Sequence, residues 1–260
     1  MTAPASPPRA LVTGVSEGIG RAVARALAAD GYAITGVARS EDRLHAVIDG
    51  LGPGHTALVA DVASEEGRKR VVQAVQRTPF AVLVNNAGIA STGPFADVPL
   101  GSAAAMLDLN CYALVTLAHA FLAAARPGDA LVNVSSTLAF APMPNLSVYS
   151  ATKAFVTSFS ESLWHEQKAR GVYVMGLCPG MTATASQPHN GNDVPAALLQ
   201  TPEQVAAVAM TALRRRAQPT VISGTKNALF AAAARTLPRR TVLRLLATEP
   251  KPPVAADTPR

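Results

Sequence analysis

The stretch RALVTGVSEGIG, residues 9–20, decides the fold. It begins with an apolar run of strand type, Arg9–Thr13, and glycines stand directly after it at positions 14, 18 and 20. Such glycines permit a tight turn and a close approach of the backbone to a phosphate group, whereas the plainer alternative is a turn without a ligand. The helix expected next would point its free N–H groups at the same place. We therefore predict a strand, a phosphate-binding turn and a helix.

The same alternation continues along most of the chain. Further strand-like runs lie at 33–38, 56–60, 81–85, 130–135 and 173–178, and helix-like stretches lie at 19–29, 41–47, 64–76, 101–125 and 149–168. Continuous apolar runs are typical of parallel strands that helices cover on both faces. We predict a single doubly wound Rossmann-type α/β domain with a mostly parallel seven-stranded sheet and helices on both faces. Its ligand site should lie beyond the carboxyl ends of the strands.

The ends of the chain differ from this pattern. We expect a flexible start at 1–8, the domain at 9–225 with a substrate loop at 181–200, a basic amphipathic helical segment at 226–247 and a flexible tail at 248–260. Thr201 and Pro202 predict a helix start after the loop. Pro238 should divide the basic segment into two short helices.

The charge of the 260-residue chain is unevenly distributed. Residues 1–203 hold 13 Lys/Arg and 15 Asp/Glu, a net charge of −2, whereas residues 204–260 carry +8. This asymmetry argues against a general nucleic-acid-binding protein. The basic segment could pack on the domain or on another subunit, or it could rest on an anionic membrane surface.

Other classes of protein are disfavoured by what the sequence contains. Cys111 and Cys178 stand far apart and have no metal-ligand pattern around them, so we expect neither a disulfide nor a metal site. We expect no apolar run that spans a bilayer and no signal peptide in MTAPASPPR. These features together predict a cytoplasmic protein.

The end of the second strand bears on which dinucleotide binds. An NAD-binding domain usually has an acidic side chain there, but this chain has Ala38, followed by Arg39 and Ser40. Arg39 could pair with a 2′-phosphate and Ser40 could add a hydrogen bond; the alternative is a solvated loop arginine. We predict that NADP(H) is preferred and that NAD(H) is possible, although Glu17 in the glycine turn would repel a 2′-phosphate.

Two further strand ends face the expected cofactor site. Asp61 and Val62 follow the third strand and could hold the adenine edge, although Asp61 could equally cap the next helix. Asn85 and Asn86 could tie neighbouring strands together, with the backbone of Ala87 and Gly88 lying along the cofactor.

Tyr149 and Lys153 form the expected chemical centre. At the start of a helix, positions i and i+4 share one face, so the phenol and the ammonium group point the same way. A positive charge beside a tyrosine, with that of an oxidised nicotinamide, should lower its high pKa and make it a better general base. Ser136 ends the fifth strand and could polarise a carbonyl group. Asn110, which is unusual inside a helix, could hold a water molecule.

These motifs together resemble the short-chain dehydrogenase/reductase superfamily, from about Arg9 to Gln204. The matching features are TGxxxGIG at 13–20, NNAG at 85–88, Asn110, Ser136, YxxxK at 149–153, and Pro179, Gly180 and Thr184 after the sixth strand. The resemblance implies a catalytic tetrad of Asn110, Ser136, Tyr149 and Lys153. In that tetrad Tyr149 is the general acid or base, Ser136 holds the carbonyl oxygen, Lys153 bonds the nicotinamide ribose, and Asn110 anchors a proton-relay water.

The residues expected at the cofactor are therefore Gly14, Ser16, Gly18, Ile19, Gly20, Arg39, Ser40, Asp61, Val62, Asn86, Ala87, Gly88, Tyr149, Lys153, Pro179, Gly180 and Thr184. The expected reaction interconverts a small-molecule carbonyl and its alcohol by hydride transfer. Because the 181–200 loop has few charges, a neutral or apolar substrate is favoured. The resemblance also implies a homodimer or homotetramer that pairs through the fourth and fifth helices. Two other functions remain open, a non-catalytic dinucleotide-binding redox sensor and a membrane-surface reductase of lipid-like carbonyls.

Overall fold

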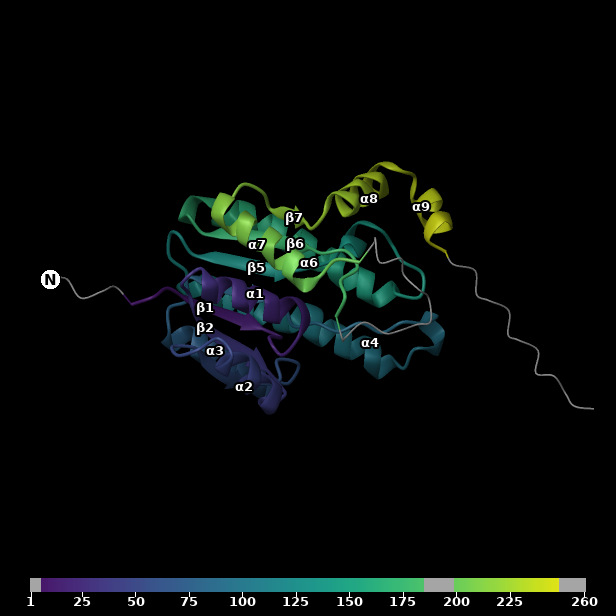
Figure 1. Cartoon of the computed structure of the whole chain (residues 1–260). Coiled ribbons are helices and arrows are strands. Elements are labelled where there is room, and N and C mark those ends of the chain that lie inside the picture. The colour runs from purple at the N-terminus through teal and green to yellow at the C-terminus, as the bar shows by residue number, and fades with distance from the viewer. Residues whose placement is uncertain (1–5, 185–198, 248–260) are drawn as a thin grey trace, which may run out of the picture.

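A seven-stranded, all-parallel sheet forms the centre of the computed structural model, which describes residues 6–184 and 199–247 (Figure 1). Its strand order is β3-β2-β1-β4-β5-β6-β7. The strands are β1 (Arg9–Thr13), β2 (Ala33–Ala38), β3 (Thr56–Val59), β4 (Val82–Asn85), β5 (Ala130–Val134), β6 (Tyr173–Cys178) and β7 (Thr220–Ile222). The order reverses between β1 and β4, and at such a reversal a ligand-binding crevice is expected at the carboxyl ends of the strands.

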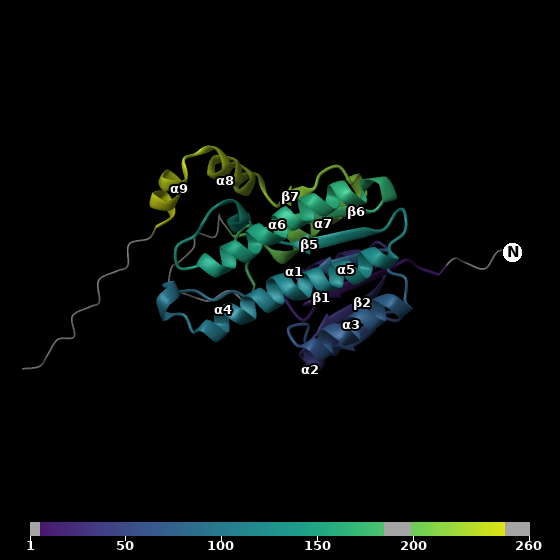
Figure 2. The ribbon, with the colours of Figure 1, turned by 180° about the vertical axis from the view of Figure 1, so that it is seen from behind.

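Helices cover both faces of this sheet. The face with α1 (Gly18–Ala29), α2 (Glu41–Asp49) and α7 (Pro202–Arg215) is seen in Figure 1, where α1 and α7 pack on each other. Figure 2 shows the opposite face, with α3 (Glu65–Arg77), α5 (Leu114–Ala124) and α6 (Ser147–Gln167). Each face buries its own apolar cluster, one around Leu27 and Met210, the other around Val71, Leu117 and Leu163. The predicted Rossmann-type α/β architecture is thus confirmed.

The predicted elements agree with the observed ones to within a few residues, because most are apolar runs with clear ends. Thr201 caps α7 in a capping box with Gln204, as the sequence predicted. No run had been assigned to β7, which has only three residues, all half-buried. The first helix of the basic segment, α8 (Thr225–Thr236), begins within one residue of the predicted position 226, shortly after β7.

The long helix predicted at 101–125 is continuous but changes its winding. It begins as α4 (Leu100–Leu107), passes through a π-helical turn at Asp108–Ala113 and continues as α5. Contrary to the expectation from sequence, this 25-residue stretch, with a mean hydropathy of 1.4, is long and apolar enough to cross a membrane by length and composition. Half of its apolar window is nevertheless buried inside the structure, as in a core helix.

The C-terminal arm consists of α8 and α9 (Arg239–Leu246), separated near Pro238 as predicted. It packs on its own domain through a third apolar cluster that joins Ala231, Ala234 and Val242 to Phe140 and Cys178. Leu229 and Leu245 of the arm remain exposed. Of the segments expected to be flexible or loop-like, residues 1–5, 185–198 and 248–260 lie outside the described residues.

Candidate active site

The glycine turn after β1 has the backbone that its sequence predicts. Gly14 and Gly18 have φ angles of 70° and 57°, which favour glycine over other residues. A Cβ atom on Gly20 would overlap the carbonyl oxygen of Gly14 and the amide of Asn86. A Cβ on Gly18 would lie 2.9 Å from the methyl group of Thr184, so the segment after β6 reaches the turn. The structure therefore brings Gly14, Gly18, Gly20 and Thr184 together.

The strand ends beside this turn are joined by side-chain amides, as expected. Asn86 Nδ2 donates to the carbonyl oxygens of Thr13 at 2.9 Å and Gly14 at 3.2 Å. Asn85 Nδ2 donates to Asn133 Oδ1 on β5 at 3.0 Å. The Thr13 hydroxyl, which was not among the residues expected from sequence, accepts from the backbone N–H groups of Asn86 and Ala87, both at 3.0 Å. These bonds fix the Ala87–Gly88 backbone next to the turn.

At the end of β2, a second arginine lies near Arg39 that was not among the residues expected from sequence. Arg39 is exposed and Ser40 is the N-cap residue of α2. Arg43, in the first turn of α2, donates from Nε to Ser40 Oγ at 3.1 Å, and its Nη1 lies 3.4 Å from Glu17 Oε2. The acidic group that opposed an NADP preference thus has a positive partner. The available signal was a second arginine shortly after Arg39, in the first turn of the predicted helix.

Asp61 and Val62 have mainly local roles in this structure. Asp61 Oδ1 accepts from the Ala63 backbone at 3.0 Å, and the N-cap of α3 is Ser64 rather than Asp61. Val62 is buried in the apolar cluster beneath α3 and α5. Ser16 and Ile19 lie half-buried in the glycine turn.

The expected catalytic side chains come from the ends of β5 and α6. Ser136 follows β5 and is the N-cap of a short 3₁₀ turn, Thr137–Phe140. Lys153 is buried in α6, and its Nζ lies 5.6 Å from the centre of the Tyr149 ring. The same Nζ donates to the carbonyl oxygen of Val134 at 3.0 Å, which holds the ammonium group at the end of β5. Ser136, Tyr149 and Lys153 are therefore neighbours.

Burial dominates the titration of this cluster. It raises the pKa of the Tyr149 phenol above its usual value, while a hydrogen bond with Ser136 acts in the opposite direction. Burial also lowers the pKa of Lys153 to about 8, against the smaller raising effects of Cys111 and Cys178. The expected lowering of the Tyr149 pKa by Lys153 is therefore not found in the chain alone, where burial raises this pKa and the opposing effect comes from Ser136.

Asn110 lies in the π-helical turn, and its side chain is engaged by protein groups. Its Oδ1 accepts from the backbone N–H of Ile89, and its Nδ2 donates to the Ile89 carbonyl oxygen, both at 2.9 Å. Nδ2 also donates to Thr152 Oγ1 at 3.1 Å, on the helix that carries Tyr149 and Lys153. Asn110 thus joins the segment after β4 to α6. Its place in the π-helical turn agrees with the frequent occurrence of such turns at functional sites.

The segment after β6 completes the crevice. Pro179 is buried, and its carbonyl oxygen accepts from the Thr137 backbone at 2.9 Å, next to Ser136. Gly180 follows at the same sheet edge, and Thr182 Oγ1 donates to its carbonyl oxygen at 3.0 Å. The residues expected beside a nicotinamide therefore lie between Ser136 and the glycine turn.

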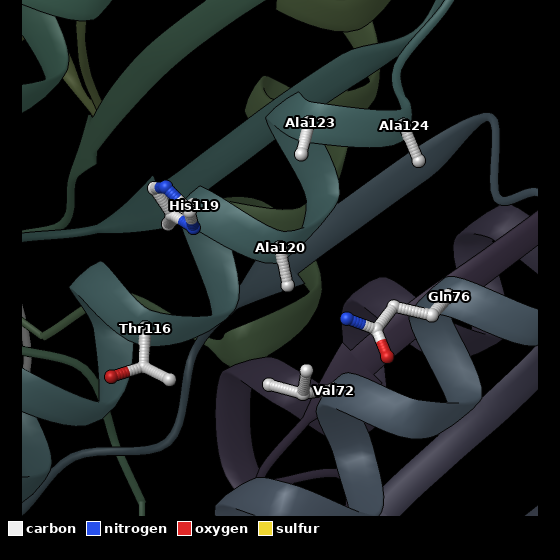
Figure 3. Close-up of a pocket in the computed structure, with 7 residues that line it drawn as sticks. All are labelled: Val72, Gln76, Thr116, His119, Ala120, Ala123 and Ala124. Atoms are coloured by element: carbon white, nitrogen blue, oxygen red, sulfur yellow. The ribbon is translucent and has the colours of Figure 1, made fainter.

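A separate groove of about 320 Å³ lies between α3 and α5. Figure 3 shows Val72 and Gln76 of α3 facing Ala120 of α5, with His119 and Thr116 further along α5. None of the residues expected at the active site lines this groove.

The crevice fits an extended dinucleotide. Its glycine turn has the positive φ angles that let the backbone approach a phosphate closely, and the N-terminus of α1 supplies free N–H groups beside it. Cationic side chains lie at both ends of the crevice. Arg39 and Arg43 follow β2 at one end, and Lys153 of α6 lies at the end of β5 at the other. The residues present therefore suit NAD or NADP.

Comparisons with known proteins agree with this geometry. Residues 8–194 match the short chain dehydrogenase family. The chain is 36% identical over 180 residues to a short chain dehydrogenase of Pseudocercospora fijiensis, covering 66% of this chain and 58% of that protein. It is 34% identical over 178 residues to a serine 3-dehydrogenase of Rhizobium radiobacter, covering 67% and 72%.

One solved structure shares nearly the whole fold. It is a short-chain dehydrogenase from Sphingobium yanoikuyae in complex with NADPH, with a TM-score of 0.78 and 29% sequence identity. The likeness covers 96% of this chain and 99% of the other.

Proposed function

The chain belongs to the short-chain dehydrogenase family, and we propose from this premise that it interconverts a carbonyl and an alcohol, with NADP(H) as the preferred cofactor. The observation that carries the proposal is the cluster of Ser136, Tyr149 and Lys153 at the carboxyl edge of the sheet, beside a glycine turn shaped for a dinucleotide. Bound there, the cofactor would supply or accept the hydride.

In this proposal each side chain has a role that suits its surroundings. Tyr149 keeps its proton at neutral pH, since burial raises a pKa whose ordinary value is already 10.0, so it can donate that proton to the carbonyl oxygen during reduction. Ser136 donates a hydrogen bond to the same oxygen and polarises it. Lys153, anchored on Val134, offers its other N–H groups to the nicotinamide ribose. Asn110 and Thr152 hold α6 in register with the Ile89 segment and so position Tyr149.

The NADP preference rests on the end of β2. Ala38 leaves no carboxylate to bind a ribose hydroxyl, and Arg39 is exposed and available to a 2′-phosphate. Arg43 offsets the charge of Glu17 at the neighbouring turn. The solved relative with bound NADPH supports the same choice.

Isothermal titration of NADPH and NADH tests this preference. Wild type should bind NADPH more tightly than NADH, and Arg39→Asp should lose about tenfold or more of the NADPH/NADH affinity ratio. Arg25→Asp, a change of the same charge elsewhere on the surface, is the control. An unchanged ratio in Arg39→Asp would contradict the assignment.

The substrate proposed is a small neutral or apolar carbonyl compound. The active unit proposed is a homodimer or homotetramer. Measuring NADPH oxidation with a panel of ketones, aldehydes and fatty-acyl carbonyls would identify the substrate class. Turnover confined to charged substrates would contradict the proposal.

A further inference from the structure

The part of the chain beyond the family match reaches back to the active site. The match ends at residue 194, whereas β7 and the C-terminal arm follow it. The first turn of α8 places Asn227 against the segment after β6, which carries Pro179 and Gly180. Asn227 was not among the residues expected from sequence.

Asn227 belongs to a closed set of hydrogen bonds. Its Nδ2 donates to the Ser223 carbonyl oxygen at 2.6 Å and to Gln200 Oε1 at 3.1 Å. Gln200 Nε2 donates to Ser223 Oγ at 3.0 Å, and Ser223 is completely buried. Two hydrogen-bond partners that also bond to each other therefore fix the orientation of the Asn227 amide.

The same amide lies directly on Gly180. A Cβ atom at that position would overlap the Asn227 side-chain amide, and the three nearest atoms all belong to Asn227. Gly180 is not among the glycines with positive φ, so its backbone conformation does not demand glycine. The space taken by Asn227 is what excludes a side chain here.

Gln200 extends this contact along the segment. Its backbone N–H donates to the Met181 carbonyl oxygen, and its carbonyl oxygen accepts from Ala183, both at 2.9 Å. Residues 179–184 are thereby held from two directions, by Asn227 through Gly180 and by the backbone of Gln200. The far end of the segment, Thr184, lies on Gly18 of the glycine turn.

We propose that Asn227, supported by Gln200, is a positioning residue that sets where residues 179–184 stand beside the nicotinamide end of the cofactor. The inference rests on the proposed function, since it assumes that this crevice holds the dinucleotide. Asn227 does not touch the reacting atoms; it acts through Gly180 and its neighbours.

Calorimetric affinity for NADPH is the first test, with the melting temperature of the nucleotide-free protein measured in parallel. Asn227→Ala and Asn227→Asp, which remove both donated hydrogen bonds, should bind NADPH about tenfold more weakly. Leu229→Ala, an exposed position on the same helix, is the matched control and should bind like wild type. A lowered melting temperature with unchanged affinity would overturn the positioning role.

A paired substitution tests the contact itself. Gly180→Ala should weaken NADPH binding, because its methyl group collides with Asn227. Adding Asn227→Ala removes the obstacle, so the double variant should bind no more weakly than Gly180→Ala alone. Losses that multiply in the double variant would overturn the proposal.

Each titration is repeated with NADH to separate this inference from the proposed function. A wild type that prefers NADH contradicts the NADP preference, yet the Asn227 variants must still lose affinity for NADH. Full NADH affinity in Asn227→Ala would overturn the role of Asn227 whichever nucleotide is preferred.

Discussion

Lys153 connects the chemistry of this site to the stability of the fold. Its ammonium group is buried and has Val134 as a backbone acceptor, and its pKa is lowered from 10.5 to about 8. The folded chain therefore releases this proton at a lower pH than the unfolded chain does. Burying the charge costs stability below pH 8, and that cost is relieved as the pH rises towards 10.5.

The effect of burying this charge can be measured by comparing wild type with a variant that lacks the ammonium group. The free energy of unfolding of wild type, minus that of Lys153→Met, should increase between pH 8 and 10.5, at up to about 1.4 kcal/mol per pH unit. Chemical denaturation of both proteins at several pH values gives this difference. Groups that are present in both proteins, such as Cys178, contribute to both free energies of unfolding, and their contributions cancel when one is subtracted from the other. A difference that stays flat, or that falls across this window, would contradict a lowered Lys153 pKa.

Among the secondary-structure elements, the C-terminal arm contacts the short turn that follows Ser136, on the side of the site where the substrate is proposed to bind. The guanidinium carbon of Arg235 lies 4.3 Å from the centre of the Phe140 ring, and Arg239 Nη1 donates to the Phe140 carbonyl oxygen at 3.4 Å. Phe140 ends the 3₁₀ turn that begins after Ser136. The arm therefore supports the wall of the crevice on which Ser136 stands.

Replacing Arg235 should act on substrate rather than on cofactor. Arg235→Ala should raise the KM for the preferred carbonyl about twofold to fivefold, as expected for loss of a partly exposed cation–π contact, with NADPH affinity unchanged. Arg235→Lys should recover part of the effect, and Arg240→Ala on α9 serves as the control. Steady-state kinetics gives the KM for the carbonyl, and calorimetry gives the NADPH affinity. A loss of NADPH affinity equal to the change in KM would count against this role.

How much the sequence reveals differs between elements. Strands such as β1, β2 and β6 were predictable because they are continuous apolar runs with abrupt ends. The glycine turn and the Tyr149–Lys153 pair were predictable because each is a spacing within one short segment, whereas the expected roles of Ser136 and Asn110 depended on the resemblance to a family. Arg43, Gln200 and Asn227 were not, since their roles depend on contacts between distant segments, and β7 is too short and too weakly buried to leave a pattern. The π-helical turn was signalled only by Asn110 in a helix interior.

For the whole molecule, the faces of α4, α5 and α6 are the expected site of subunit pairing. They lie side by side in Figure 2, and they expose Leu107, Tyr112 and Phe155, with exposed fractions of 52%, 59% and 43%. The Phe155 ring stacks on Phe159 at a centroid distance of 5.8 Å. Exposed aromatic groups of this kind are typical of protein–protein interfaces.

Light scattering after gel filtration should therefore find a dimer or a tetramer. Phe155→Glu should shift the mass towards the monomer, because a carboxylate would have to be buried in the interface. Leu245→Glu, an equally drastic change on the exposed face of α9, should leave the mass unchanged. An assembly that tolerates Phe155→Glu but dissociates with Leu245→Glu would place the interface on the C-terminal arm.

If Tyr149 transfers the proton in a reaction that consumes NADPH, replacing its hydroxyl group should stop the reaction without affecting the cofactor. NADPH oxidation is followed with the best carbonyl of the panel for wild type and Tyr149→Phe, alongside the NADPH affinity of both. We expect the variant to lose turnover by a factor of about 10² to 10⁴ while binding NADPH as tightly as wild type. Turnover that survives in Tyr149→Phe would contradict it, and so would a wild type that binds NADPH but reduces no carbonyl compound.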